Sequence, residues 1–235
     1  MKNILTKIFS SKADLSSKEL SFLEITKKTK VSEIFKVISN YNESSEIRYV
    51  GGCVRKILNN EKIDDIDLAT NLKPNEVKEC LQNNNIDFFE TGIEHGTITA
   101  RLDDKNFEIT SLRKDVSTDG RHAKVEFTNE WTEDALRRDF TINSIYADKD
   151  GNLFDPNDGV KDLERGKVEF IGDPEQRIKE DYLRILRYIR FFLNYSKQDH
   201  GLNVKKIIKQ NISGVTKLSK ERLIDELKKL VISNG

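Results

Sequence analysis

The stretch YVGGCVRKILNNEKIDDIDLAT, residues 49–70, places two glycines, an arginine and a group of aspartates between two expected strands. Asp64, Asp65 and Asp67 lie within four positions, and carboxylates this close repel one another unless a cation lies between them. Because side chains alternate along a strand, we expect Asp65 and Asp67 to point to the same face. Two questions follow: which cation the carboxylates share, and why a Gly-Gly turn precedes them.

A divalent cation suits two carboxylates at a strand end. Mg²⁺ prefers few carboxylates, several waters and substrate phosphates, and two metal ions about 3.5–4 Å apart can assist phosphoryl transfer. Gly51 and Gly52 would let backbone N–H groups at a helix start approach a phosphate, and Arg55 could reach the same group. We therefore predict a Mg²⁺ site at Asp65 and Asp67, beside a triphosphate site at Gly52 and Arg55. The alternative is a surface acidic turn beside an unrelated glycine turn.

The composition excludes several classes of protein. The chain has 235 residues, 36% hydrophobic and 34% charged, which suits one or two globular domains with a sizeable core. No apolar run is long enough to span a bilayer, and residues 1–20 lack the apolar segment of a secretory signal. We therefore expect no membrane partner. Cys53 and Cys80 fit no metal-ligand spacing, so we expect free thiols in a reducing cytoplasm.

The charge is balanced overall but unevenly distributed. The 40 basic and 40 acidic residues cancel, yet from Ile171 onward 14 basic residues face 8 acidic ones, a net charge of +6. Residues 1–170 therefore carry −6. This gradient suits a metal site beside a polyanion-binding surface, and lysine-rich helices with ordinary solvated faces are an equally good interpretation.

The periodicity predicts an α+β fold. We expect an N-terminal helical segment over residues 1–45, strands and short helices over 46–170, and an all-helical region over 171–235. One helix is expected around 132–146. The polar stretch 113–124 is expected to be a loop, either ordered over a bound nucleotide or disordered.

The RRDFTIN segment contains possible nucleotide ligands. Arg138 could bind a phosphate, while Asp139 and Asn143 lie one helical turn apart and could bond a ribose hydroxyl. Alternatively, the two arginines only form the solvent-exposed face of a helix. For Phe140 and Ile142 we expect a purely structural, anchoring role.

The chain from Pro174 is expected to be helical to its end, and one of its helices is expected to carry an apolar stripe. The stripe comprises Ile178, Tyr182, Ile185, Ile189 and Phe192. Asp181 and Arg184 lie off it, three positions apart. They form either an ion pair worth a few tenths of a kcal/mol or a fixed acceptor–donor edge of the kind that reads a base.

Two further motifs contain weaker candidates. In FEITSLR, alternation places Glu108, Thr110 and Leu112 on one face. If that face meets the aspartate strand, Glu108 helps to order the metal site, and a cross-strand surface pair is at least as good an interpretation. In EHGT, we expect His95 to position other groups, because metal-assisted phosphoryl transfer relies mainly on the metal ions.

Taken together, these motifs resemble the class II family of tRNA CCA-adding enzymes and bacterial poly(A) polymerases. The family pattern is GGxVRD followed by DxDxAT, and this chain has GGCVRK and DIDLAT. The other matches follow in family order: EHGTIT (94–99), FEITSLR (107–113), RRDFTIN (137–143), DPNDGVKDL (155–163), EDYLRILRYIRF (180–191) and SKERLIDELKKL (219–230).

The resemblance implies a polymerase-beta-like nucleotidyltransferase head, with a mixed sheet flanked by helices, followed by an all-helical neck. It implies that Arg138 contacts ATP or CTP and that Asp181 and Arg184 pair with the incoming base, so that the protein itself is the template. It also implies that Arg187 and Arg190 contact the nucleotide. The expected reaction adds CMP and AMP to the 3′ end of tRNA, and poly(A) or A-only addition is the closest variant.

The chain departs from the family pattern at two places. Lys56 stands where the family has an aspartate that braces the arginine, which bears on how Arg55 is oriented. The chain ends at Gly235, whereas family members continue into body and tail domains that hold tRNA, so we expect these domains to be largely absent. A nucleotide-binding module without turnover is therefore one alternative, and a helical interaction protein with an incidental acidic cluster is another.

Overall fold

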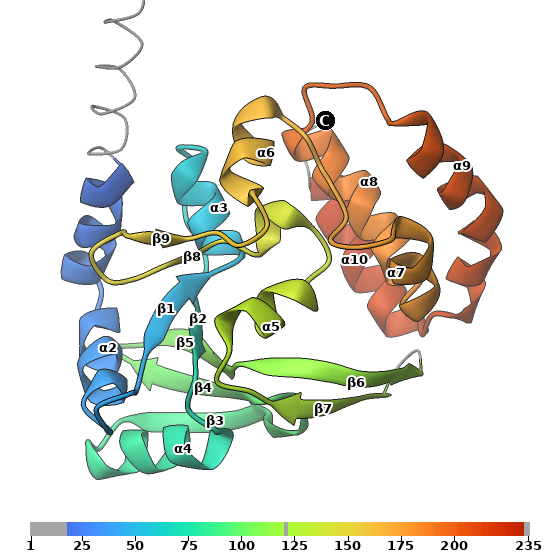
Figure 1. Ribbon diagram of the computed structural model, residues 1–235. Helices are drawn as coiled ribbons and strands as arrows, with labels where there is room; N and C mark the ends of the chain where they lie inside the picture. Colours follow the sequence, from blue (N-terminus) through green and yellow to red (C-terminus); the bar gives the residue numbers. More distant parts are fainter. Residues whose placement is uncertain (1–17, 120–121, 233–235) are drawn as a thin grey trace, which may run out of the picture. The chain divides into compact units, whose positions relative to one another are not determined.

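The computed structural model describes residues 18–119 and 122–232, which belong to two compact units (Figure 1). The first unit contains the chain up to Arg113 together with Phe127–Trp131 and Ile145–Phe154. The second contains Lys114–Glu126, Thr132–Ser144 and the chain from Asp155 onward. The three-part division expected from the sequence stays a prediction.

A mixed sheet of seven strands forms the centre of the first unit. Its spatial order is β3-β4-β5-β2-β1-β8-β9, with β2 and β5 parallel and the other neighbouring pairs antiparallel. The strands are β1 (Ile47–Val50), β2 (Asp67–Thr70), β3 (Asp87–Gly92), β4 (Thr97–Leu102), β5 (Lys105–Ser111), β8 (Tyr146–Ala147) and β9 (Leu153–Phe154). The predicted α+β class with a mixed sheet is confirmed.

One face of this sheet is apolar and covered by helices. These are residues 18–28, α2 (Val31–Ser39) and α4 (Pro74–Asn83), while α3 (Gly52–Leu58) follows β1 directly. Tyr49 of β1 packs against Phe22 and Phe35, with ring centroids 5.6 and 4.8 Å apart. Leu68 is fully buried on the same face, because it lies opposite Tyr49 in the β1–β2 register. Alternation therefore puts Asp67 on the other face.

The second unit is mostly helical. Its helices are α5 (Trp131–Leu136, whose first residue belongs to the first unit), α6 (Gly159–Arg165), α7 (Pro174–Glu180), α8 (Leu183–Tyr195), α9 (Leu202–Asn211) and α10 (Lys220–Ile232). Phe140 anchors its core, with ring centroids 4.8 Å from Phe170 and 5.4 Å from Phe191. Phe140 and Ile142 are fully buried, which confirms their structural role.

Three local predictions were wrong. Residues 113–124 were expected to be a loop, but β6 (Arg113–Asp119) and β7 (His122–Phe127) form a two-stranded sheet. The helix expected around 132–146 ends at Leu136, because Phe140 forms a β-bridge with Phe170; a 3-10 turn, Thr141–Asn143, follows.

The helix expected to carry the apolar stripe from Ile178 to Phe192 is broken at Asp181. That residue has extended backbone angles, φ −153° and ψ 106°, and its Oδ1 accepts a hydrogen bond from the Leu183 amide at 3.1 Å. The aspartate therefore ends α7 and opens α8. The break in the helix also changes which residues are buried. In α8 the buried side chains are Ile185, Tyr188, Phe191 and Tyr195, in place of the expected stripe.

No helix in the described ranges is long and apolar enough to cross a membrane.

Candidate active site

The Gly-Gly turn and the Asp67 carboxylate adjoin each other. Gly51 has φ 67° and ψ −119°, a conformation that glycine adopts without strain, and α3 starts at Gly52. A Cβ atom placed on Gly52 would lie 3.7 Å from Asp67 Oδ2. The carboxylate therefore lies in van der Waals reach of the first residue of α3, as the sequence hypothesis requires.

Glu108 is the neighbour of Asp67 on the same face of the sheet. The two residues are partners in the parallel β2–β5 register, and Thr99 of β4 lies opposite Glu108 on its other side. Glu108 is exposed, whereas Asp67 is half-buried. The FEITSLR strand thus lies beside the aspartate strand, which is the condition on which a role of Glu108 depends. That role, ordering the metal site, stays a prediction.

Asp64 has a partner of its own. Lys56 Nζ lies 2.5 Å from Asp64 Oδ2, and this hydrogen bond and charge lower the pKa of the Asp64 carboxyl. Asp65 is exposed and precedes β2, which begins only at Asp67. Strand pleating therefore does not orient Asp65, and the shared face stays a prediction.

A divalent cation fits this chemistry with two carboxylates. Within residues 18–119 and 122–232, no group of three or more His, Cys, Asp or Glu side chains is arranged to hold a metal ion. Mg²⁺ takes most of its ligands from water and substrate phosphates, so a pair of carboxylates suffices to place it. Asp67, at the edge of the Gly-Gly turn, and Asp65 are the residues that could hold it.

The neighbouring side chains of α3 point into the protein. Arg55 is only 7% exposed. The Cys53 thiol donates to the backbone oxygens of Val50 at 3.3 Å and Asp67 at 3.5 Å, and burial raises its pKa to about 12. Cys53 therefore fastens α3 to both strands as a neutral thiol and has no role as a nucleophile.

In the second unit, Asp139 is the centre of a buried network. Its Oδ1 accepts from the Phe140 amide and from Asn143 Nδ2, both at 2.9 Å, and its Oδ2 accepts from Arg187 Nε at 2.6 Å. Arg187 Nη2 also lies 2.6 Å from Oδ2 in an ion pair. Burial alone would raise the pKa of Asp139, but Arg187, Asn143 and the amide outweigh it and lower the pKa to about 2. The structure thus joins three candidate residues into one rigid group.

Arg138 is held by a residue that the sequence reasoning missed. Asp134 is 1% exposed and accepts from Arg137 at 2.6 Å and from Arg138 at 3.0 Å. The spacings of three and four residues are those of neighbouring side chains on a helix, so this signal was present in the sequence.

Asp181 and Arg184 do not pair with each other. Asp181 Oδ2 accepts from Arg222 at 2.7 Å, and Arg184 Nη1 donates to Glu180 Oε2 at 2.6 Å. The alternative in which they form an ion pair with each other is therefore wrong, because the backbone break at Asp181 removes the helical geometry on which it depended, and their role in base recognition stays a prediction.

Arg190 packs against α10. Its Nε donates to Glu226 Oε1 at 2.6 Å, and its guanidinium lies 4.3 Å from the centroid of the Phe191 ring. Glu226 is 3% exposed, so the charge of Arg190 is largely neutralised inside the α8–α10 contact. Sequence reasoning missed Arg222 and Glu226, which lie 41 and 36 residues from their partners.

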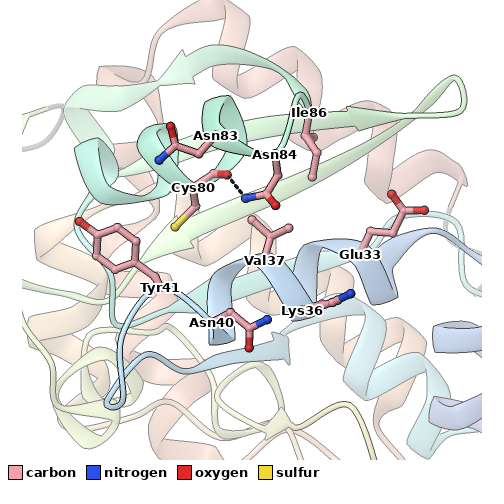
Figure 2. Close-up of a pocket in the computed structure, with 9 residues that line it drawn as sticks. All are labelled: Glu33, Lys36, Val37, Asn40, Tyr41, Cys80, Asn83, Asn84 and Ile86. Carbon is pink, nitrogen blue, oxygen red and sulfur yellow. Dashed lines mark hydrogen bonds between the residues drawn. The ribbon is translucent and has the colours of Figure 1, made fainter.

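A pocket of the first unit lies away from Asp67. It has a volume of about 630 Å³ and lies between α2 and α4, lined among others by Lys36, Tyr41, Cys80 and Asn84 (Figure 2). These helices cover the apolar face of the sheet, so the pocket is on the opposite side from Asp67. It takes no part in the candidate site.

Comparison with known proteins identifies the chain. Residues 47–169 match the poly A polymerase head domain. The chain belongs to the poly(A) polymerase head-domain family. This family match confirms the resemblance seen in the motifs, and its range includes Asp65, Asp67, Arg138 and Asp139.

Relatives of this head-domain protein include CCA-adding enzymes. The human mitochondrial CCA tRNA nucleotidyltransferase 1 is 50% identical over 195 residues, which cover 82% of this chain and 45% of that protein. A crystal structure of the Bacillus stearothermophilus CCA-adding enzyme in complex with CTP is 29% identical, with a TM-score of 0.74 over 84% of this chain and 47% of that one. A tRNA nucleotidyltransferase complexed with a primer tRNA and an incoming ATP analog is 26% identical, with a TM-score of 0.65 over 83% of this chain and 55% of that one. The chain thus spans about half the length of the relatives it matches.

Proposed function

We propose that this head-domain protein transfers CMP and AMP from CTP and ATP to the 3′ end of tRNA in a Mg²⁺-dependent reaction. The observation that carries the proposal is the Asp67 carboxylate beside Gly52 of the Gly-Gly turn, in a chain half of whose sequence matches the poly A polymerase head domain. Relatives named CCA-adding enzymes support the choice of tRNA, CTP and ATP.

The proposed reaction is nucleotidyl transfer. The 3′-hydroxyl oxygen of the tRNA bonds to the α-phosphorus, the bond from that phosphorus to the pyrophosphate oxygen breaks, and the hydroxyl proton passes to solvent. Asp65 and Asp67 would hold Mg²⁺, and Gly52 and Arg55 would bind the triphosphate. The chemistry that Mg²⁺ supplies when bound is neutralisation of phosphate charge and stabilisation of the attacking and leaving oxygens.

Residues of the second unit would select and orient the nucleotide. We assign recognition of the hydrogen-bonding edge of the base to Asp181 and Arg184. Their separate partners, Arg222 and Glu180, hold each side chain in a fixed orientation. An acceptor and a donor held in this way can discriminate between bases without a nucleic-acid template.

The other nucleotide contacts that we propose come from the Asp139 network. Asp139 and Asn143 would bond a ribose hydroxyl, and Arg138, Arg187 and Arg190 would contribute positive charge to the nucleotide. Asp139 already receives hydrogen bonds from the Phe140 amide, Asn143 Nδ2 and Arg187 Nε and forms an ion pair with Arg187, so it would hold Asn143 in place for the ribose contact.

Nucleotide binding without turnover is the second candidate. The observation behind it is that the chain spans about half the length of each relative, so the named activity of those proteins is matched over only part of their length. Poly(A) or A-only addition is a third possibility, because the family match is to a poly A polymerase head.

The compartment also stays a proposal. The cytoplasm was predicted from the two thiols, and both cysteines are free and buried, which fits any reducing compartment. The human relative is named a mitochondrial enzyme, so cell fractionation has to decide between the two locations.

A primer-extension assay tests the function. A tRNA transcript that lacks its terminal CCA is incubated with Mg²⁺ and labelled CTP alone, ATP alone, or both. CCA addition requires CTP before ATP, whereas poly(A) addition proceeds with ATP alone. Extension is expected to disappear in Asp67→Asn and Asp65→Asn and to persist in Asp64→Asn, the matched control, because Asp64 pairs with Lys56.

The outcomes separate the candidates. Mg²⁺-dependent thermal stabilisation by CTP and ATP without extension would favour the binding module. Neither stabilisation nor extension would refute both, and equal activity in all three aspartate variants would refute the metal site.

A further inference from the structure

The outer face of α9 gathers lysines around one exposed leucine. The residues that share it lie at helical positions i, i+3, i+4, i+7 and i+8: Leu202, Lys205, Lys206, Lys209 and Gln210. Together they line a shallow depression of about 380 Å³. The opposite side of the helix carries Ile207, which is 7% exposed and packs inward. The lysines are therefore directed to solvent by the same amphipathic pattern that anchors the helix.

The charge of this face is uncompensated. Residues 201–220 contain five lysines and no acidic residue, and all five lysines are exposed. Among the residues that the structure describes, no carboxylate forms an ion pair with Lys205, Lys206 or Lys209. Other exposed lysines are neutralised: Lys167 lies 3.0 Å from Glu169 and Lys179 lies 2.6 Å from Glu175. The α9 face thus contributes strongly to the positive charge found from Ile171 onward.

We propose that this α9 face binds the phosphate backbone of RNA, outside the nucleotide site. The proposal rests on the proposed function for its choice of RNA as the polyanion. Lysine ammonium groups on flexible stems bind phosphates as point charges, and each contact releases condensed counterions. Leu202, which is 87% exposed, offers apolar contact to a ribose or an unstacked base.

The composition of the face argues for RNA rather than a membrane surface. Interfacial helices insert a broad apolar face into the lipid, whereas the outward side of α9 offers a single leucine among lysines. The apolar residues Val204 and Ile207 are on the side that packs against the rest of the unit. Electrostatic complementarity to a polyanion is therefore the dominant attraction available to this surface.

A salt titration of RNA binding tests the proposal. The full chain is mixed with a tRNA transcript whose 3′ end is blocked, so that no turnover is needed, and Kd is measured across a range of salt concentrations. The variant Lys205→Gln/Lys206→Gln/Lys209→Gln is expected to bind at least about tenfold more weakly at 0.1 M salt. The slope of log K against log salt should fall in magnitude by about 2 to 3, since each lost phosphate contact contributes about 0.7 to 0.9.

A matched control removes the same charge elsewhere. Lys28→Gln/Lys167→Gln/Lys179→Gln changes three exposed lysines that each already pair with an acid, at 2.7, 3.0 and 2.6 Å. This control should retain the slope and affinity of the unmodified chain. Leu202→Ser should weaken binding while leaving the slope unchanged, because it removes an apolar contact and no charge.

Several outcomes would overturn the proposal. Equal slopes for the α9 variant and the control would show that these lysines contact no phosphate. Tighter binding to anionic lipid vesicles than to tRNA, lost in the same variant, would assign the face to a membrane. Thermal stabilisation by CTP and Mg²⁺ should persist in the α9 variant. If CTP and Mg²⁺ stabilised neither the unmodified chain nor any variant, that result would count against the nucleotide site and not against the α9 face.

Discussion

The ion pair between Asp139 and Arg187 should make a measurable part of the stability depend on pH. Asp139 is 8% exposed, and its pKa is lowered from 3.8 to about 2. A shift of this size corresponds to roughly 2 to 3 kcal/mol at neutral pH, because each pKa unit contributes about 1.36 kcal/mol. Since the folded-state pKa is the lower one, this stability is present above the unfolded value of 3.8 and is lost as the pH falls toward about 2.

The perturbation that isolates this contribution is Asp139→Asn. It preserves the side-chain shape but removes the charge that neutralises Arg187, so we expect a loss of about 3 kcal/mol at pH 7, the low end of the range for breaking a buried pair. The loss should shrink to near zero at the lowest pH, where the carboxyl of the unmodified chain is protonated. Urea unfolding followed by far-ultraviolet circular dichroism gives the free energy of unfolding at each pH.

Two further variants complete the experiment. Arg187→Gln and the double variant close a double-mutant cycle, whose coupling energy at pH 7 should be about 2 kcal/mol. Glu175→Gln removes an exposed carboxylate that pairs with Lys179 and should change stability little. A pH-independent difference between Asp139→Asn and the unmodified chain would refute the reasoning, as would coupling below about 0.5 kcal/mol.

Three other predictions follow from single contacts. Gly52→Val puts branched carbons beside the carboxylate 3.7 Å away and should weaken Mg²⁺-dependent CTP binding more than tenfold with little change in Tm, as titration and calorimetry would show. Arg222→Ala frees Asp181 from its 2.7 Å partner, so KM for CTP and ATP should rise and discrimination against GTP and UTP should fall; unchanged selectivity would contradict this assignment. Glu226→Gln leaves the Arg190 guanidinium buried without its counter-charge and should cost about 3 kcal/mol in urea unfolding, a result that a change below about 1 kcal/mol would rule out.

The lysine that departs from the family pattern has a structural role. Lys56 does not brace Arg55 as the usual aspartate is expected to do; it pairs with Asp64 at 2.5 Å. One of the three clustered aspartates is thereby neutralised by the chain itself. The repulsion noticed in the sequence is partly relieved before any metal is bound, and Asp65 and Asp67 are the two carboxylates to which we assign the proposed cation.

Several features of this protein could be inferred from the sequence because their causes are local. Alternating polarity in IDLAT and FEITSLR predicted strands with an apolar and a polar face, and the register places Asp67 beside Glu108 on the polar one. The Gly-Gly turn before α3 follows from the need for positive φ at Gly51. The order of short motifs identified the family without any knowledge of packing.

Only the tertiary structure decided which charges meet. Asp139 and Arg187 are 48 residues apart, Asp181 and Arg222 are 41 apart, and Arg190 and Glu226 are 36 apart. Helical spacing cannot reveal such pairs, and at Asp181 it was misleading, because the backbone leaves the helix there. A sequence determines local conformation through the preferences of neighbouring residues, whereas long-range ion pairs depend on how separate elements pack once the chain has folded.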